Sequence, residues 1–180
     1  MRRQAINHDM VGGRVLFTDS TQLKANANKH KYTRKTIEQD TQNYIKDLNE
    51  AIQEDREEHG KKPLPAKEEV KAEKEIRHST TDPESGYMYC ENKPEGFFYL
   101  DHRTTDMKYN IITDAYVTPG NVHDSVPYLD RLDHEITLFG FQVEAVTLDS
   151  GYLTAPICKG LSDRQIFGVI AHRHTYILNN

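Results

Sequence analysis

The alternation of apolar and polar positions divides the chain into strand-like and helix-like segments. A β-branched and apolar run, Val15-Leu16-Phe17-Thr18, leads into Asp19 near the N-terminus. Residues 14–27 therefore predict a strand, a turn around Asp19 and a return strand. Residues 1–12 have no clear periodicity and predict a tail that ends at the turn-forming Gly12-Gly13 pair.

A helical period begins at Arg34 and continues to about Glu58, with apolar residues at spacings of three and four. This pattern predicts an amphipathic helix. A glycine and two prolines after Glu58 end it. Residues 66–78 then predict a second, weaker and highly charged helix. We therefore expect a helical hairpin inserted at about residues 34–80.

The C-terminal half starts with strand-like runs rich in aromatic and β-branched residues and then alternates helices with strands. A polar link through Thr104-Thr105-Asp106 predicts a hairpin between the first two strands. Asp124 or Ser125 is the predicted N-terminal cap of the next helix. The predicted elements are strands at 97–100 and 109–117, a helix from about 124 to 139, a strand at 143–148, a helix from 154 to about 164 and a strand at 166–171. The residues of the first helix that we expect to face the core are Val126, Leu129, Leu132 and Ile136.

This order of elements predicts a mixed α/β sheet in which two aspartates meet. If the strand at 143–148 pairs in parallel with the first strand, Asp19 and Asp149 emerge at neighbouring positions. A carboxylate at the end of an apolar strand is costly unless it is solvated, hydrogen-bonded or bound to a cation. Two of them together predict half of a Mg²⁺ site for phosphodiester chemistry. For each aspartate taken singly, the alternative is a helix or turn cap.

The formal net charge of −5 argues against a nucleic-acid-binding protein, but the charge is distributed unevenly. Residues 1–35 carry eight Lys and Arg against two Asp, whereas the rest of the chain is acidic. This basic block predicts contacts with phosphates, and an ordinary solvated surface is the alternative. Its candidate nucleic-acid-binding residues are Lys24, Lys29, Lys31, Arg34 and Lys35.

Composition points to a protein with a modest core, since 36% of the residues are hydrophobic and 28% are charged. No apolar run approaches the roughly 18 residues of a membrane span, and no signal-peptide apolar region follows Arg2-Arg3. Cys90 and Cys158 are isolated and lack metal-ligand spacing. We therefore expect no membrane association, no disulfide and a cytoplasmic location.

Four segments carry a family resemblance: DSTQLKANANK at 19–29, STTDPE at 79–84, VTPGNVHDS at 117–125 and LDSGY at 148–152. They resemble, in the same order, the signature segments of bacterial insertion-sequence transposases of the DDE class. The resemblance implies a ribonuclease H-like fold, metal-dependent DNA cleavage and strand transfer, and Mg²⁺ or Mn²⁺ as cofactor. It also implies that Asp19 and Asp149 are the first two metal-binding acids and that His123 and Asp124 lie near the active site, where His123 is a candidate DNA contact.

The chain also departs from this family. The family's third acid is a Glu on a helix after the last strand, and the sequence reaches Asn180 without such a helix. We therefore interpret residues 13–180 as a partial, C-terminally incomplete catalytic domain that is inactive alone. For the full-length protein we expect transposon-end and target DNA as partners, and a homodimer. Two alternatives stay open: a ribonuclease H-like nuclease that acts without strand transfer, and a degenerate or domesticated remnant that acts as a DNA- or protein-interaction module.

Overall fold

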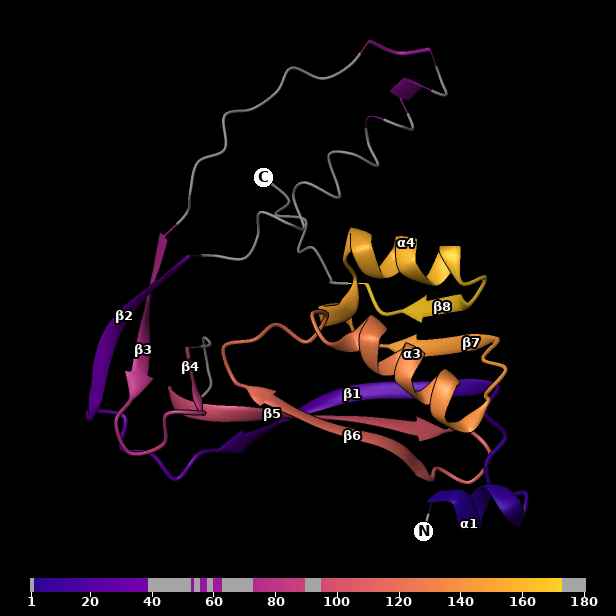
Figure 1. Cartoon of the computed structure of the whole chain (residues 1–180), viewed down its shortest axis with the longest axis horizontal. Coiled ribbons are helices and arrows are strands. Elements are labelled where there is room, and N and C mark those ends of the chain that lie inside the picture. The colour runs from indigo at the N-terminus through magenta and orange to yellow at the C-terminus, as the bar shows by residue number, and fades with distance from the viewer. Residues whose placement is uncertain are drawn as a thin grey trace, which may run out of the picture.

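The computed structural model describes residues 2–38, 53, 56–57, 60–62, 73–89 and 95–172, and these form a mixed α/β structure with two β-sheets (Figure 1). The described helices are α1 (Arg2–Asn7), α3 (Tyr128–Phe139) and α4 (Ala155–Asp163), with a short 3-10 helix, η1 (Ser150–Tyr152). The strands are β1 (Val15–Lys24), β2 (Tyr32–Glu38), β3 (Glu73–Ser79), β4 (Gly86–Met88), β5 (Gly96–Asp106), β6 (Ile112–Pro119), β7 (Ala145–Leu148) and β8 (Phe167–Ile170).

The larger sheet has six strands, with β5 and β1 at its centre. β5 pairs antiparallel with β1 on one side and with both β4 and β6 on the other. β7 pairs in parallel with β1, and β8 pairs in parallel with β7. The predicted mixed sheet is therefore confirmed, including the parallel pairing of the first strand with the strand that leads to Asp149.

One hydrophobic core joins this sheet to α3 and α4. Leu16 on β1 and Val146 on β7 are fully buried in it, and the helices contribute Leu132 and Ile157. Burying a side chain of this size stabilises the fold by about 1.5–3 kcal/mol. Successive residues of a strand point to opposite faces, so Phe17 lies on the other face of β1, where it is 37% exposed.

The predicted helical insertion is wrong at both of its ends. Residues 32–38 form β2 and residues 73–79 form β3, and these two strands pair antiparallel as a separate two-stranded sheet (Figure 1). The remainder of the predicted hairpin lies almost wholly outside the described residues. The apolar spacing fits a helix, but Tyr32, Thr33 and Ile76 also suit a pleated strand. The pairing of β2 with β3, which lie far apart in sequence, determined the structure here more strongly than the local helical spacing of apolar residues did.

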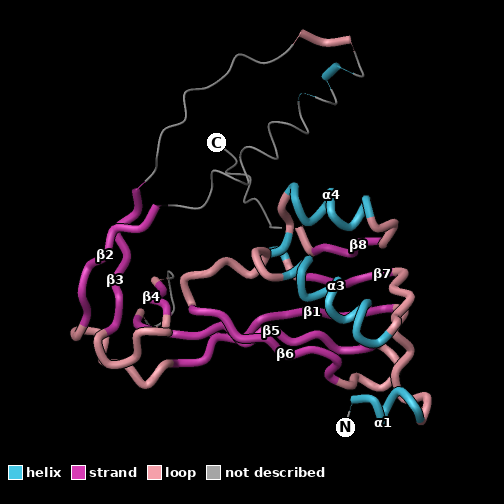
Figure 2. The backbone as a smooth tube through the Cα atoms, in the orientation of Figure 1, coloured by secondary structure: helices cyan, strands magenta, loops and turns pink. Residues whose placement is uncertain are grey.

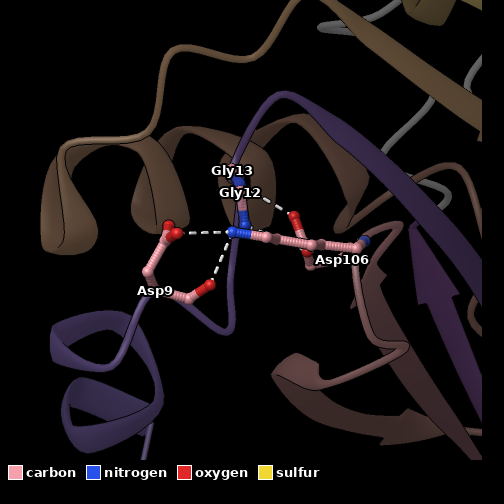
Figure 3. Close-up of polar contacts among 5 residues, drawn as sticks. Asp9, Gly12, Gly13 and Asp106 are labelled. Carbon is pink, nitrogen blue, oxygen red and sulfur yellow. Dashed lines mark hydrogen bonds and ion pairs between the residues drawn. The ribbon is translucent and has the colours of Figure 1, made fainter.

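Residues 2–7 of the predicted N-terminal tail form α1, and the chain after it is held against β5. The buried carboxylate of Asp106 accepts hydrogen bonds from the amides of Gly12 at 3.0 Å and Gly13 at 2.8 Å (Figure 3). It also accepts one from the amide of Lys108 at 2.9 Å, and the ammonium group of Lys108 lies 2.8 Å from the Asp9 carboxylate. These contacts fix the point at which β1 begins.

Two predicted boundaries in the larger sheet shift as well. β1 continues through Asp19 to Lys24 without a turn, because its register with β5 is unbroken over this length. Residues 104–106 belong to β5, so the confirmed β5–β6 hairpin turns later, at 107–111. α3 begins at Tyr128 rather than near Asp124, and its N-terminal cap position is Pro127.

Candidate functional site

Asp19 and Asp149 occupy equivalent positions on two neighbouring parallel strands. The last register pair of β1 and β7 is Thr18 opposite Leu148, and each aspartate directly follows one member of that pair. Thr18 and Leu148 are buried, whereas both aspartates are exposed. Neighbouring strands lie about 4.8 Å apart. The predicted meeting of the two strand ends therefore takes place, although β1 itself continues beyond Asp19.

Each of these carboxylates accepts one backbone hydrogen bond through its Oδ1 atom. The amide of Ser20 donates to Asp19 and the amide of Gly151 donates to Asp149, both at 2.8 Å. The second of these bonds caps η1, so the alternative interpretation of Asp149 as a cap holds for one of its two oxygens. Among the described residues, no hydrogen bond reaches the Oδ2 atom of either aspartate.

The loop between β6 and α3 (pink in Figure 2) brings a third carboxylate, that of Asp124, to the same place. The hydroxyl of Ser20 donates a 2.8 Å hydrogen bond to Asp124 Oδ1. A Cβ atom placed on Gly151 would lie 3.5 Å from Asp124 Oδ2 and 3.0 Å from Asp149 Oδ1, so these two carboxylates flank Gly151. The interpretation of Asp124 as the cap of α3 is wrong, because the helix begins four residues later in the chain.

The buried hydroxyl of Tyr152 lies in the electrostatic field of these three carboxylates. Tyr152 is 1% exposed, and its hydroxyl has no hydrogen-bond partner among the described residues. Burial raises the pKa of this phenol, and the negative charges of Asp124, Asp149 and Asp19 raise it further. The hydroxyl therefore stays protonated and is available as a donor beside the acidic cluster.

A cleft of about 670 Å³ opens beside Asp149 and Asp124. His123 lines it as well and is exposed, with its Nδ1 atom 2.8 Å from the Ser125 hydroxyl. The structure thus brings the predicted His123 to the rim of the site. Asp19 does not line this cleft, although the next residue along β1 does.

The predicted basic residues are not gathered at the two aspartates. Lys24 ends β1, Lys29 and Lys31 lie in the following loop, and Arg34 and Lys35 belong to β2. Lys29 lies 3.9 Å from an exposed glutamate, and Arg34 lies 3.4 Å from another. Exposed ion pairs of this kind contribute about 0–1 kcal/mol. These cations therefore belong to the surface that leads away from the site along β1 and β2.

The oxygen donors of the cluster suit a hard divalent cation. Mg²⁺ is commonly held by one or two carboxylates, with water and substrate phosphates completing its octahedron. Asp19 and Asp149 fit that role through their Oδ2 atoms. Within the described part of the chain, no group of three or more His, Cys, Asp and Glu side chains is arranged to hold a metal ion. Asp124 therefore stands beside a two-carboxylate site rather than completing a set of three ligands.

Sequence reasoning also missed a buried acid beneath the sheet, Glu135 on α3. Glu135 is 1% exposed, and its Oε1 atom has no hydrogen-bond partner among the described residues. Burial raises the pKa of this carboxyl from its usual value of 4.5 to about 7, and the neighbouring Thr113 hydroxyl partly offsets that effect. The hydroxyls of Thr18 and Thr104 lie 2.9 Å apart and extend this polar layer. Thr18 is the residue directly before Asp19.

Comparison with family models, curated proteins and solved structures yields no significant match to this chain. None of the described helices is both long and apolar enough to cross a membrane. Cys158 is an exposed free thiol, and Cys90 lies outside the described residues.

Proposed function

We propose that this chain is the catalytic core of a metal-dependent polynucleotidyl transferase of the DDE transposase class, acting on DNA. The observation that carries this proposal is the parallel pairing of β1 with β7, which leads Asp19 and Asp149 out of the sheet side by side. A ribonuclease H-like fold is supported by the order of the strands, in which β7 follows three antiparallel strands and a helix and then returns beside β1.

The four segments that resemble the transposase family are linked to one another in space, although they are far apart in sequence. The hydroxyl of Ser20 in the first segment donates to Asp124 in the third. Asp124 in turn flanks Gly151 of the fourth segment. The second segment is tied to the first, because the Thr81 hydroxyl accepts a 3.4 Å hydrogen bond from the amide of Asn28. These contacts bring the first, third and fourth segments together near the two aspartates and join the second segment to the end of the first, beyond Lys24.

The chemistry proposed for this site divides between a cation and the side chains of the chain. Mg²⁺ held here would activate the attacking oxygen of a phosphodiester exchange and stabilise the leaving oxygen. Asp19 and Asp149 would hold the cation with their carboxylates, whose Oδ1 atoms are fixed by backbone amides. Ser20 holds Asp124 at the rim.

The proposal is tested by the dependence of DNA binding on Mg²⁺, measured by fluorescence anisotropy with a labelled duplex. We expect Mg²⁺ to strengthen binding to the wild-type protein at constant ionic strength, because a cation held by the carboxylates would supply positive charge for a phosphate. The double variant Asp19→Asn, Asp149→Asn should lose that increment. The matched control is Asp9→Asn, since the side chain of Asp9 is 90% exposed and far from the site in the fold. An equal Mg²⁺ increment in the double variant, or no DNA binding by any protein, would overturn the proposal.

One observation favours a second candidate function, an interaction module without catalysis. It is that the described residues supply no third acid in a metal-binding arrangement. A module of this kind would bind DNA through its basic residues, so its affinity would fall with salt but would not rise with Mg²⁺. The same anisotropy titration therefore distinguishes the two functions.

A further inference from the structure

The cleft beside Asp149 continues into a second hollow. That hollow, of about 420 Å³, is lined by residues of β3 and β4, and it shares Met88, Gly120 and Asn121 with the first cleft. The two hollows adjoin at these three residues, and we call them together the β4 groove. It runs from the carboxylates of Asp149 and Asp124 to Arg77 and Tyr89.

Two close backbone approaches fix the floor of the β4 groove. A Cβ atom on Gly86 would lie 2.4 Å from the backbone nitrogen of Asn121, and one on Gly120 would lie 2.8 Å from the carbonyl oxygen of Phe98. The amide of Gly120 also donates a 2.8 Å hydrogen bond to that same carbonyl. The turn at 120–121 is thus packed closely against β4 and β5, and the groove is preformed.

The end of the groove that lies away from Asp149 and Asp124 is also lined by Glu75, and it combines one oriented cation with an exposed aromatic ring. The Arg77 guanidinium carbon lies 4.3 Å from the centre of the Tyr87 ring and 5.1 Å from that of Tyr32. Arg77 also donates a hydrogen bond to the Tyr87 hydroxyl, and the residue remains exposed. Tyr89 lines the same hollow and is 73% exposed. An arginine held on aromatic rings presents its edge to a phosphate, and an exposed tyrosine presents a face for stacking.

The open edge of β1 borders the other end of the groove. Past Thr18, β1 has β5 on one side and, among the described residues, no strand on the other. Thr21 and Gln22 of this stretch line the groove. The groove therefore begins where β7 ends, which is the position of Asp149.

We propose that the β4 groove binds a single strand of nucleic acid, with one phosphate at the Asp19–Asp149 pair and the adjoining nucleotides extending along β4 to Arg77 and Tyr89. This inference rests on the proposed function, which supplies the phosphate at the aspartates. Single-strand sites pair a cationic contact to the backbone with aromatic faces for the bases, and the far end of the groove offers both. A duplex instead requires many cations placed along its phosphates, and the groove is lined by one arginine, no lysine and the carboxylates of Glu75, Asp124 and Asp149.

The test compares two exposed tyrosines in the full chain. Binding of a fluorescent single-stranded oligonucleotide of about 15 nucleotides, and of the matching duplex, is measured by anisotropy in Mg²⁺ for the wild type, Tyr89→Ala and Tyr109→Ala. Tyr109 is 62% exposed and belongs to the β5–β6 turn, so it is the matched control. We expect Tyr89→Ala to weaken single-strand binding about tenfold, as loss of one stacked base does, and Tyr109→Ala to leave it unchanged.

A second variant tests the cation. Arg77→Ala should weaken single-strand binding and reduce the slope of log affinity against log salt by about one, whereas Arg77→Lys should retain most of that slope. Equal affinities for the wild type, Tyr89→Ala and Arg77→Ala, or tighter binding of the duplex than of the single strand, would overturn the inference. The double variant Asp19→Asn, Asp149→Asn can lose the increase in affinity that Mg²⁺ gives while Tyr89→Ala and Arg77→Ala bind single strands normally. In that case the proposed binding of a single strand in the β4 groove is wrong and the proposed function stands. If the wild type binds no nucleic acid, both are wrong.

Discussion

Asp19 and Asp149 each follow one partner of the same register pair, so their carboxylates emerge side by side where β7 ends and β1 continues. Like charges at such positions repel each other unless a cation or a proton intervenes. Each carboxylate is held by a backbone amide through Oδ1. The chain therefore holds two acidic groups at neighbouring places, and a cleft opens beside Asp149.

The first prediction concerns the buried hydroxyl of Tyr152. Because this O–H has no hydrogen-bond partner among the described residues, Tyr152→Phe should leave the free energy of unfolding unchanged or raise it by about 1 kcal/mol. Tyr99→Phe is the matched comparison, since the Tyr99 hydroxyl donates to Asp82 Oδ1 at 2.7 Å. That variant should lose about 1–2 kcal/mol. Urea unfolding measures both, and equal losses would show that the Tyr152 hydroxyl is satisfied in the folded protein.

The second prediction concerns the pH dependence that Glu135 confers. Burial raises the pKa of this carboxyl from 4.5 to about 7, so the folded state binds its proton more tightly than the unfolded state does. Its contribution to stability is therefore fully present below pH 4.5 and is lost as the pH rises through 7. Relative to Glu135→Gln, the wild type should lose on the order of 3 kcal/mol between pH 4.5 and pH 8.

Urea unfolding at pH 5 and pH 8 checks this prediction, with Glu84→Gln as the control because Glu84 is exposed. The Glu84 variant should keep the pH dependence of the wild type, and Glu135→Gln should flatten it. A Glu135→Gln variant with the wild-type pH dependence would mean that Glu135 titrates normally.

The third prediction concerns the carboxylate that fixes the start of β1. Asp106 is 1% exposed and accepts three backbone hydrogen bonds, so Asp106→Ala leaves buried amides without an acceptor. We expect a loss of about 3 kcal/mol or more. Asp9→Ala, which removes an exposed partner of Lys108, should cost less than about 1 kcal/mol. Thermal unfolding of the two variants checks the contrast, and similar losses would contradict the role given to Asp106.

Local sequence patterns predicted much of the larger sheet and of the helices that pack on it. β5, β6, β7, β8 and α4 lie close to where periodicity placed them, because each carries its own strand or helix signal over a short stretch. β2 and β3 were missed, since their pairing joins segments that are far apart in the chain and that separately fit a helical period. The spacing of apolar residues within one segment does not indicate that the segment pairs with a distant one.

The site was predicted in its first two acids and missed in the groups around them. Asp19 and Asp149 follow from the order of the strands. For Asp124 the sequence left two roles open, a place near the active site and the cap of the next helix, and the hydrogen bond from Ser20 could not be foreseen from spacing. Glu135 was missed because a charged residue within a helix is expected to face solvent. The apolar stripe that predicted this helix also predicted that Val126 faces the core. Val126 is 68% exposed instead, because α3 begins after this residue.

The most direct test of the central claim is Mn²⁺ binding, followed by the electron paramagnetic resonance signal of the free ion during titration. We predict that the wild-type protein removes free Mn²⁺ from solution, that Asp9→Asn does so equally, and that Asp19→Asn and Asp149→Asn each bind at least about tenfold more weakly, because each removes one of two carboxylate ligands. Equal Mn²⁺ binding by all four proteins, or none by the wild type, would contradict the account.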